Sequence, residues 1–184
     1  NKKLVESHQR CFETYGMTET ITHIAVSKLA IPKKPFKALD GIRLKLDKEG
    51  CLVVDAPDIT DKLIYTNDIV NMHDEENFTY LGRRDNVINS GGVKIFPEVV
   101  ERKLASHIGL PFFVYGIPDK VLGEKLVLVV EGEECQLPEF KLNQTSLKGL
   151  DKFEVPKEIR YVSEILRNNG KYLREKTMNT LIIS

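Results

Sequence analysis

Residues 82–101 read GRRDNVINSGGVKIFPEVVE, and this stretch decides how the second half of the chain folds. We expect a short strand around Ile88 and a tight turn at Gly91 and Gly92. Pro97 is typical of the first position of a helix, because its missing N–H would have no intrahelical partner there. Fixed charges beside a glycine turn with exposed N–H groups also suit an anionic ligand, although the turn taken alone favours a plain hairpin loop.

Downstream of Pro97 the hydrophobic period changes to that of a helix. Val100, Leu104 and Ile108 lie four residues apart, and Gly109 follows as a stop signal, which predicts an amphipathic helix over residues 97–108. Further predicted elements are strands at residues 112–115, 126–130 and 159–162 and a weaker helix at residues 139–150. Residues 85–184 are therefore predicted to form a compact α+β domain.

Upstream, two hairpins are predicted from alternating apolar residues and turn chemistry. The first joins residues 42–46 to residues 52–54 through the turn DKEG, and the second joins residues 69–72 to residues 78–81 through a polar tip. They predict a small antiparallel, β-barrel-like sheet over about residues 24–82, as part of a first domain at residues 1–84. Because no Pro/Gly/Ser linker separates the two predicted domains, any hinge must be one or two residues long.

The composition is that of a folded protein whose positive and negative charges balance, so its overall electrostatic field is weak. The 184 residues are 41% hydrophobic, and 27 Lys and Arg residues balance 27 Asp and Glu residues. We therefore expect no nucleic-acid partner and no membrane surface as partner, and any anion site must be local. Three widely spaced cysteines without a C-x-x-C pair argue against a disulfide framework or a structural zinc site. With no apolar run of membrane-spanning length and no signal-peptide core, we expect a cytoplasmic protein.

Three short strings combine residue types that could bind a nucleotide. Residues 15–20 read YGMTET and offer an aromatic face for a base, hydroxyls for a phosphate and a carboxylate for a hard cation, or simply a turn with a capping threonine. Asp68 at a strand entrance is most often a turn former. The planar fork of Arg83 can bind vicinal hydroxyls or a phosphate, or pair with Asp85 at the surface.

The order of these strings resembles that of the adenylate-forming enzymes, the acyl- and aryl-CoA synthetase superfamily. The similar strings are YGMTET at residues 15–20, TND at 66–68, GRRD at 82–85, SGGVK at 90–94 and GKYLR at 170–174. The chain departs from the superfamily's patterns at four positions, where Asn67 replaces glycine, Val99 replaces glutamate, Ile165 replaces proline and Arg167 replaces threonine.

The resemblance implies a role for each matching residue. Those implied to bind ATP or AMP are Tyr15 against adenine, Gly16 beside it, Thr18 at the α-phosphate, and Asp68 and Arg83 at the ribose. Glu19 is implied to bind Mg²⁺, and Lys171 is implied to act in catalysis together with Thr18 and Glu19. Asp85 is implied to be the hinge, and Ser90, Gly91, Gly92 and Lys94 are implied to form a loop beside the CoA tunnel.

The same resemblance implies an ATP-dependent acid–CoA ligase that uses Mg²⁺, with a small-molecule carboxylate, ATP and CoA as its partners. The resemblance covers only the last part of such an enzyme, so we expect this chain to be inactive alone. Two alternatives stay open: the acid could be that of any synthetase in the superfamily, or the fold could serve a non-catalytic nucleotide-binding or interaction module. The altered string around Lys171 supports the second alternative.

Overall fold

The computed structural model describes residues 11–30, 32–133 and 149–181. The chain divides into two compact units, Asn1–Asp85 and Asn86–Ser184, and each is described by itself. The weaker helix predicted at residues 139–150 lies almost entirely outside the described residues, as does Cys135.

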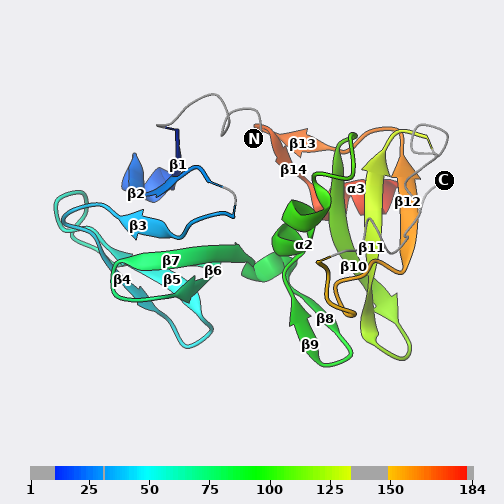
Figure 1. Ribbon diagram of the computed structural model, residues 1–184, viewed down its shortest axis with the longest axis horizontal. Coiled ribbons are helices and arrows are strands. Elements are labelled where there is room, and N and C mark those ends of the chain that lie inside the picture. Colours follow the sequence, from blue (N-terminus) through cyan, green and yellow to red (C-terminus); the bar gives the residue numbers. More distant parts are fainter. Residues whose placement is uncertain (1–10, 31, 134–148, 182–184) are drawn as a thin grey trace. The chain divides into compact units, whose positions relative to one another are not determined.

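The first unit is an antiparallel sheet of seven strands in the order β1-β2-β3-β7-β6-β5-β4 (Figure 1). The strands are β1 (Phe12–Gly16), β2 (His23–Lys28), β3 (Phe36–Ala38), β4 (Arg43–Leu46), β5 (Cys51–Asp55), β6 (Ile64–Met72) and β7 (Asn77–Arg83). Both predicted hairpins, β4–β5 and β6–β7, are confirmed. The predicted sheet is present, but in the described part of the chain its pairing runs as an open path and no pair of strands closes it into a barrel.

Turn chemistry explains the register of the first hairpin. Gly50 adopts a φ of 83°, which a residue with a side chain rarely tolerates. The Oδ1 of Asp47 accepts hydrogen bonds from the backbone N–H groups of Glu49 and Cys51, each at 2.8 Å. The turn therefore fixes the register of β4 and β5, and Leu52 and Val54 join the core of this unit.

The second unit is a mixed sheet with a helix on each face. Its elements are β8 (Ile88–Ser90), β9 (Val93–Ile95), α2 (Pro97–Leu104), β10 (Phe112–Asp119), β11 (Gly123–Glu131), β12 (Glu158–Val162), β13 (Arg167–Asn168), β14 (Lys171–Tyr172) and α3 (Arg174–Thr180). The three predicted strands are confirmed within β10, β11 and β12. Strand β11 pairs antiparallel with β10 and parallel with β12, so it is the central strand of the sheet.

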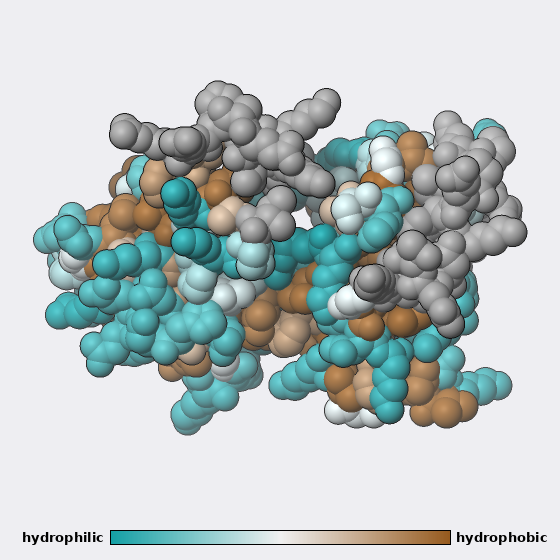
Figure 2. All heavy atoms as spheres, viewed as in Figure 1, coloured by the Kyte–Doolittle hydropathy of each residue, from teal (hydrophilic) through white to brown (hydrophobic). Residues whose placement is uncertain are grey.

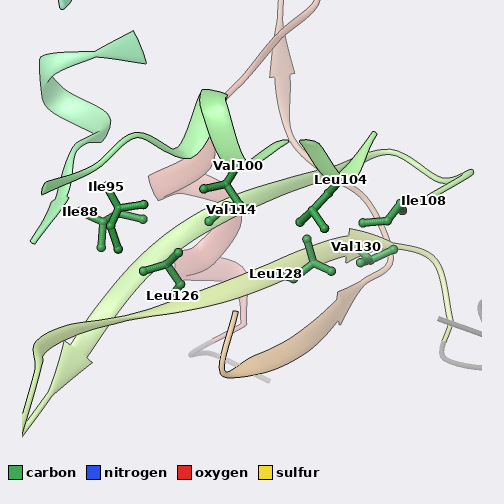
Figure 3. Close-up of a cluster of buried hydrophobic side chains, with 9 residues drawn as sticks. All are labelled: Ile88, Ile95, Val100, Leu104, Ile108, Val114, Leu126, Leu128 and Val130. Carbon is green, nitrogen blue, oxygen red and sulfur yellow. The ribbon is translucent and has the colours of Figure 1, made fainter. Parts of the chain in front are cut away.

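Strand β11 is apolar from Leu126 to Val130 because both of its faces are buried there. Figure 3 shows Leu126, Leu128 and Val130 pointing toward the apolar face of α2. The alternating residues Val127 and Val129 pack on the other side, in a core that includes Met178 of α3. A strand covered on both faces is expected to read as a continuous hydrophobic run.

Helix α2 is shorter than predicted, since it ends at Leu104 and not at Ile108. The next residues form a tighter turn, in which the N–H of His107 bonds to the carbonyl of Leu104 at 2.8 Å. Ile108 is still only 6% exposed. The four-residue spacing therefore correctly indicates that Ile108 packs in the core, but the helix itself ends before this residue.

The described helices include none that is long and apolar enough to span a membrane. Figure 2 shows hydrophilic side chains over much of the visible face, with smaller hydrophobic patches between them.

Candidate functional site

The residues predicted to form the site occur in both units. Those in the first unit are Tyr15, Gly16, Thr18, Glu19, Asp68, Arg83 and Asp85, and those in the second are Ser90, Gly91, Gly92, Lys94 and Lys171. The geometry within each unit is as follows.

Asp68 is the centre of a polar network in the first unit. Its Oδ2 accepts a hydrogen bond from the hydroxyl of Tyr15 at 2.6 Å, and Nη1 of Arg83 lies 3.6 Å from its Oδ1. Asp68 and Arg83 are cross-strand partners on β6 and β7, whereas Tyr15 comes from β1. The side chain of Asp68 is only 16% exposed. The fold therefore brings together three of the residues that were predicted from the sequence to bind one ligand.

The ring of Tyr15 is held by other aromatic rings. Its centroid lies 5.9 Å from that of Phe36, 5.3 Å from that of Phe78 and 6.3 Å from that of Tyr80. Burial raises the pKa of Tyr15 above its ordinary value, and the hydrogen bond to Asp68 adds to this rise. The hydroxyl thus keeps its proton at neutral pH and remains a donor to Asp68.

The string YGMTET contains a structural threonine and two exposed polar residues. Thr20 is fully buried, and its hydroxyl lies 3.0 Å from the carbonyl oxygen of Met17 and 2.7 Å from that of Thr22. Thr18 and Glu19 are exposed on the same short 3-10 helix, Thr18–Thr20. The turn interpretation thus fits Thr20, while Thr18 and Glu19 present their oxygens to solvent.

Gly16 is required by a close approach of the backbone. A Cβ at this position would lie 2.6 Å from the carbonyl oxygen of Thr22 and 2.7 Å from the Cα of His23. The register of β1 and β2 shifts between Tyr15 and Gly16, which brings these backbones together. Gly16 therefore shapes the chain beside Tyr15.

Replacing Gly16 with alanine is expected to lower the free energy of unfolding by about 1–3 kcal/mol, because rigid backbone atoms must move to admit the methyl group. Urea denaturation followed by circular dichroism measures this loss. Gly109→Ala is the matched control, since a Cβ there would meet no atom of the described residues within 4 Å. Equal stability of the two variants would contradict the prediction.

Asp85 is tied to residues of its own unit. Its Oδ2 accepts a hydrogen bond from the amide of Asn67, and Nη2 of Arg83 lies 3.9 Å away. Arg83 thus lies between two carboxylates, those of Asp68 and Asp85, so the predicted surface ion pair is also present. The role of Asp85 as a hinge stays a prediction.

In the second unit, the glycine loop is a two-residue hairpin turn. Ser90 pairs with Val93, and Gly91 and Gly92 between them have φ values of 58° and 80°. This is the backbone that a tight hairpin requires, so the plain hairpin interpretation is confirmed. The N–H of Gly91 already donates to the carbonyl of Leu122 at 2.8 Å. Lys94 is exposed on β9.

Lys171 is presented by a second hairpin, β13–β14. The turn residues Asn169 and Gly170 have φ values of 47° and 77°, and Asn168 pairs with Lys171. Lys171 is the first residue after the turn and is exposed. Its ammonium group can therefore reach a ligand from the tip of a short, tightly turned element.

Comparison with known proteins places these motifs in context. No family model matches the chain. Two curated relatives, the 2-succinylbenzoate–CoA ligases of Bacillus cytotoxicus and of a Geobacillus species, are 28% and 30% identical to it, and each alignment covers 93% of this chain and 41% of the relative. The o-succinylbenzoate CoA synthetase of Bacillus subtilis, bound to its acyl-adenylate intermediate, has the same fold, with a TM-score of 0.78 and 24% identity over 95% of this chain and 42% of that chain.

The chain resembles the C-terminal portion of adenylate-forming acyl-CoA synthetases. The same Bacillus subtilis enzyme in complex with ATP and magnesium ion gives a TM-score of 0.77 at 22% identity, covering 96% of this chain and 43% of that chain. The chain thus spans about two fifths of the length of the curated relatives it matches. The resemblance of the motifs to the acyl-CoA synthetase superfamily is confirmed.

Two departures from the superfamily's pattern have structural roles here. Ile165, in place of proline, is fully buried in the core that includes α3. Arg167, in place of threonine, forms an ion pair with Glu131 at 2.8 Å. The altered string around Lys171 is therefore built into the fold of this unit.

The second unit also contains a largely buried ion pair that the sequence did not predict. The two terminal nitrogens of Arg174, Nη1 and Nη2, donate to the carboxylate of Glu101, Nη2 to Oε2 at 3.0 Å, and Nη1 also donates to the carbonyl of Val114 at 3.1 Å. The Oε1 of Glu101 accepts the N–H of Val114 at 2.8 Å. Arg174 lies in the string GKYLR, but nothing in that string signalled that it pairs with Glu101, which is 73 residues away.

One group of potential metal ligands lies at the turn of the first hairpin. Within the described ranges, ligand atoms of Asp47, Glu49 and Cys51 lie within 4.8 Å of one another. Asp47 is engaged by the hairpin turn and Glu49 by Arg84, so this group is explained by the fold. Glu19 is exposed, and its role as a ligand of Mg²⁺ stays a prediction.

Proposed function

We propose that this chain is part of an ATP-dependent acid–CoA ligase. The enzyme would activate a carboxylate, o-succinylbenzoate of menaquinone synthesis, as acyl-AMP and transfer the acyl group to CoA. The observation that carries the proposal is the network of Tyr15, Asp68 and Arg83, which is held in one place by three strands. The sequence similarity to 2-succinylbenzoate–CoA ligases supports this choice of acid.

The network suits the nucleoside part of ATP. The ring of Tyr15 is fixed by its aromatic neighbours and offers a flat surface for adenine, next to Gly16. The carboxylate of Asp68 can accept hydrogen bonds from ribose hydroxyls, and the fork of Arg83 can donate to them. The side chains of Asp68 and Arg83 are already oriented by their contact with each other, so they lose little rotamer freedom when the ligand binds.

Three further residues suit the reacting phosphate. Thr18 can donate to the α-phosphate, and the exposed carboxylate of Glu19 is a hard oxygen ligand of the kind that Mg²⁺ prefers. When bound, Mg²⁺ would neutralise charge on the phosphates of ATP. Lys171 would stabilise the charge that develops as the carboxylate attacks the α-phosphorus.

The division of the chain suits an enzyme with two successive reactions. We propose that residues 1–84 end the large domain and that residues 85–184 form a mobile domain that turns about Asp85. The boundary between the compact units, which follows Asp85, supports this assignment. The loop of Ser90, Gly91, Gly92 and Lys94 would then border the CoA tunnel in the second reaction.

Two alternatives make different predictions. Another acyl- or aryl-CoA synthetase would prefer a different carboxylic acid. A non-catalytic interaction module would bind neither AMP nor CoA. We also propose a cytoplasmic location, in keeping with the free cysteines Cys11 and Cys51.

Replacing Lys171 with alanine is expected to lower the adenylation kcat by about 10²–10³-fold, because one charge that stabilises the transition state is removed. The measurement is ATP–pyrophosphate exchange by the full-length protein, dependent on o-succinylbenzoate and compared across a panel of carboxylic acids. Lys176→Ala, at an exposed lysine of α3, is the matched control and should retain activity.

The outcomes separate the alternatives. Exchange with another acid only would identify a different synthetase. No exchange with any acid, together with no AMP or CoA binding by calorimetry, would indicate the module. Substrate-dependent AMP release by the isolated 184-residue chain would contradict the expectation that it is inactive alone.

A further inference from the structure

We propose that Arg167 and Glu131 are positioning residues for Lys171, which clamp the β13–β14 hairpin to the end of the central strand β11. This inference rests on the proposed role of Lys171. It concerns two residues to which the motifs assign no role in adenylation.

The clamp consists of three polar contacts at one point. Glu131 is the last residue of β11, and its Oε2 accepts the backbone N–H of Ile165 at 2.8 Å. The same oxygen lies 2.8 Å from Nη2 of Arg167, whose Nη1 donates to the carbonyl of Ile165 at 2.6 Å. The N–H of Ile165 and the charge of Arg167 lower the pKa of Glu131, so the carboxylate is ionised at neutral pH.

The clamp reaches Lys171 through the paired strands. Arg167 pairs with Tyr172 across the hairpin, and its guanidinium carbon lies 5.3 Å from the centroid of the Tyr172 ring. That ring lies 6.1 Å, centroid to centroid, from the ring of Phe113, which is buried in the core. Lys171 is therefore flanked by the turn on one side and by an anchored tyrosine on the other.

A hairpin this small needs such anchoring. Each strand has two residues, and a short isolated hairpin is at best marginally stable in water. Its base is held to its neighbours by the N–H of Leu166, which donates to Thr177 Oγ1 at 3.0 Å, and by the N–H of Leu173, which donates to the carbonyl of Leu166 at 2.8 Å. The clamp adds a connection to the sheet, which fixes the direction in which the tip points.

The two departures from the superfamily's pattern act together in this clamp. Proline has no N–H and could not make the hydrogen bond that Ile165 donates to Glu131. Threonine in place of Arg167 could not pair with the Glu131 carboxylate as an ion. Glu131 therefore uses one oxygen to recognise both substituted residues, and the alteration of the string replaces one support for Lys171 with another.

The test compares the two half-reactions in the full-length protein. Arg167→Ala and Glu131→Gln are expected to lower the kcat of ATP–pyrophosphate exchange by about 10- to 100-fold, with the KM for ATP unchanged, since a small misplacement of a catalytic group costs rate. Transfer of the acyl group from preformed acyl-adenylate to CoA should keep its rate. Arg167→Lys should recover part of the lost kcat because it keeps the charge.

The controls make each outcome decisive. Lys125→Ala breaks a comparable pair on the same strand, with Glu158 at 2.7 Å, and should leave adenylation unchanged. One outcome would overturn this inference and leave the proposed role of Lys171 intact. In that outcome Arg167→Ala and Glu131→Gln keep the wild-type kcat, while Lys171→Ala loses activity. An equal fall in both half-reactions would also overturn it, since that pattern reports lost folded protein. Full adenylation in Lys171→Ala would instead refute the proposed role of Lys171.

Discussion

Replacing Arg174 with methionine is expected to lower the free energy of unfolding of the second unit by about 3–5 kcal/mol, because the Glu101 carboxylate is left buried without its partner. The side chains of Arg174 and Glu101 are only 13% and 18% exposed. A neighbouring carboxylate oxygen, Oε2 of Glu98, is buried and has no hydrogen-bond partner among the described residues. The remaining acidic groups would thus have lost the positive charge that both face.

The loss should depend on pH in a defined direction. Burial raises the pKa of Glu101, although Arg174 opposes this rise, so removing Arg174 raises that pKa further. A carboxyl whose pKa is higher in the folded than in the unfolded state destabilises the fold once it ionises. The deficit of Arg174→Met should therefore be full above the folded pKa and shrink as the pH falls through it, so that it is smaller at pH 5 than at pH 8.

Urea denaturation at several pH values, with hydrogen exchange of peptides from β10 and α3, measures the effect on this unit. The matched control is Arg43→Met, since Arg43 pairs with Asp55 at 2.8 Å but its side chain is 72% exposed. We expect that control to lose less than about 1 kcal/mol. A similar small loss in Arg174→Met, or a deficit that grows toward low pH, would refute the account.

Replacing Phe78 with alanine is expected to lower the free energy of unfolding of the first unit by about 3–5 kcal/mol. Phe78 is fully buried, stacks on Phe36 with a centroid distance of 5.5 Å, and meets the ring of Tyr15 edge-on at 5.3 Å. The substitution would also remove a ring that packs against Tyr15 and helps to hold it beside Asp68. Affinity of the full-length protein for AMP should therefore fall as well.

Calorimetric titration with AMP and urea denaturation measure the two effects. Phe12→Ala is the control, because Phe12 is 59% exposed and its loss should change stability by less than about 0.5 kcal/mol. Phe78→Leu fills most of the cavity and should recover most of both losses. Unchanged AMP affinity in a folded Phe78→Ala protein would show that the Tyr15 platform does not depend on Phe78.

Local chemistry made the hairpins and the start of α2 predictable. Asp47 and Gly50 fix a turn within four residues, and Pro97 marks the start of a helix whichever partner the helix packs against. The end of α2 was not predictable, because Ile108 keeps the helical spacing while its buried position is set by the sheet beneath.

The site was predictable as a set of residues but not as a set of contacts. The strings predicted that Tyr15, Asp68 and Arg83 bind the same nucleotide. They did not predict the hydrogen bond between Tyr15 and Asp68, which are 53 residues apart. Such contacts depend on strand order and register, which short motifs do not encode. For the same reason the sequence did not show that Arg167, which replaces threonine in the string around Lys171, pairs with Glu131.

The ion pair of Arg174 and Glu101 has a further consequence for the behaviour of the protein in solution. Among the described strands, β10 is the last on its side of the sheet, where unpaired backbone groups could recruit a strand from another molecule. At Val114 the N–H is bonded to Glu101 and the carbonyl to Arg174, so both groups are already occupied. The two charged side chains thus stand where an invading strand would have to pair, and they protect the sheet from edge-to-edge aggregation.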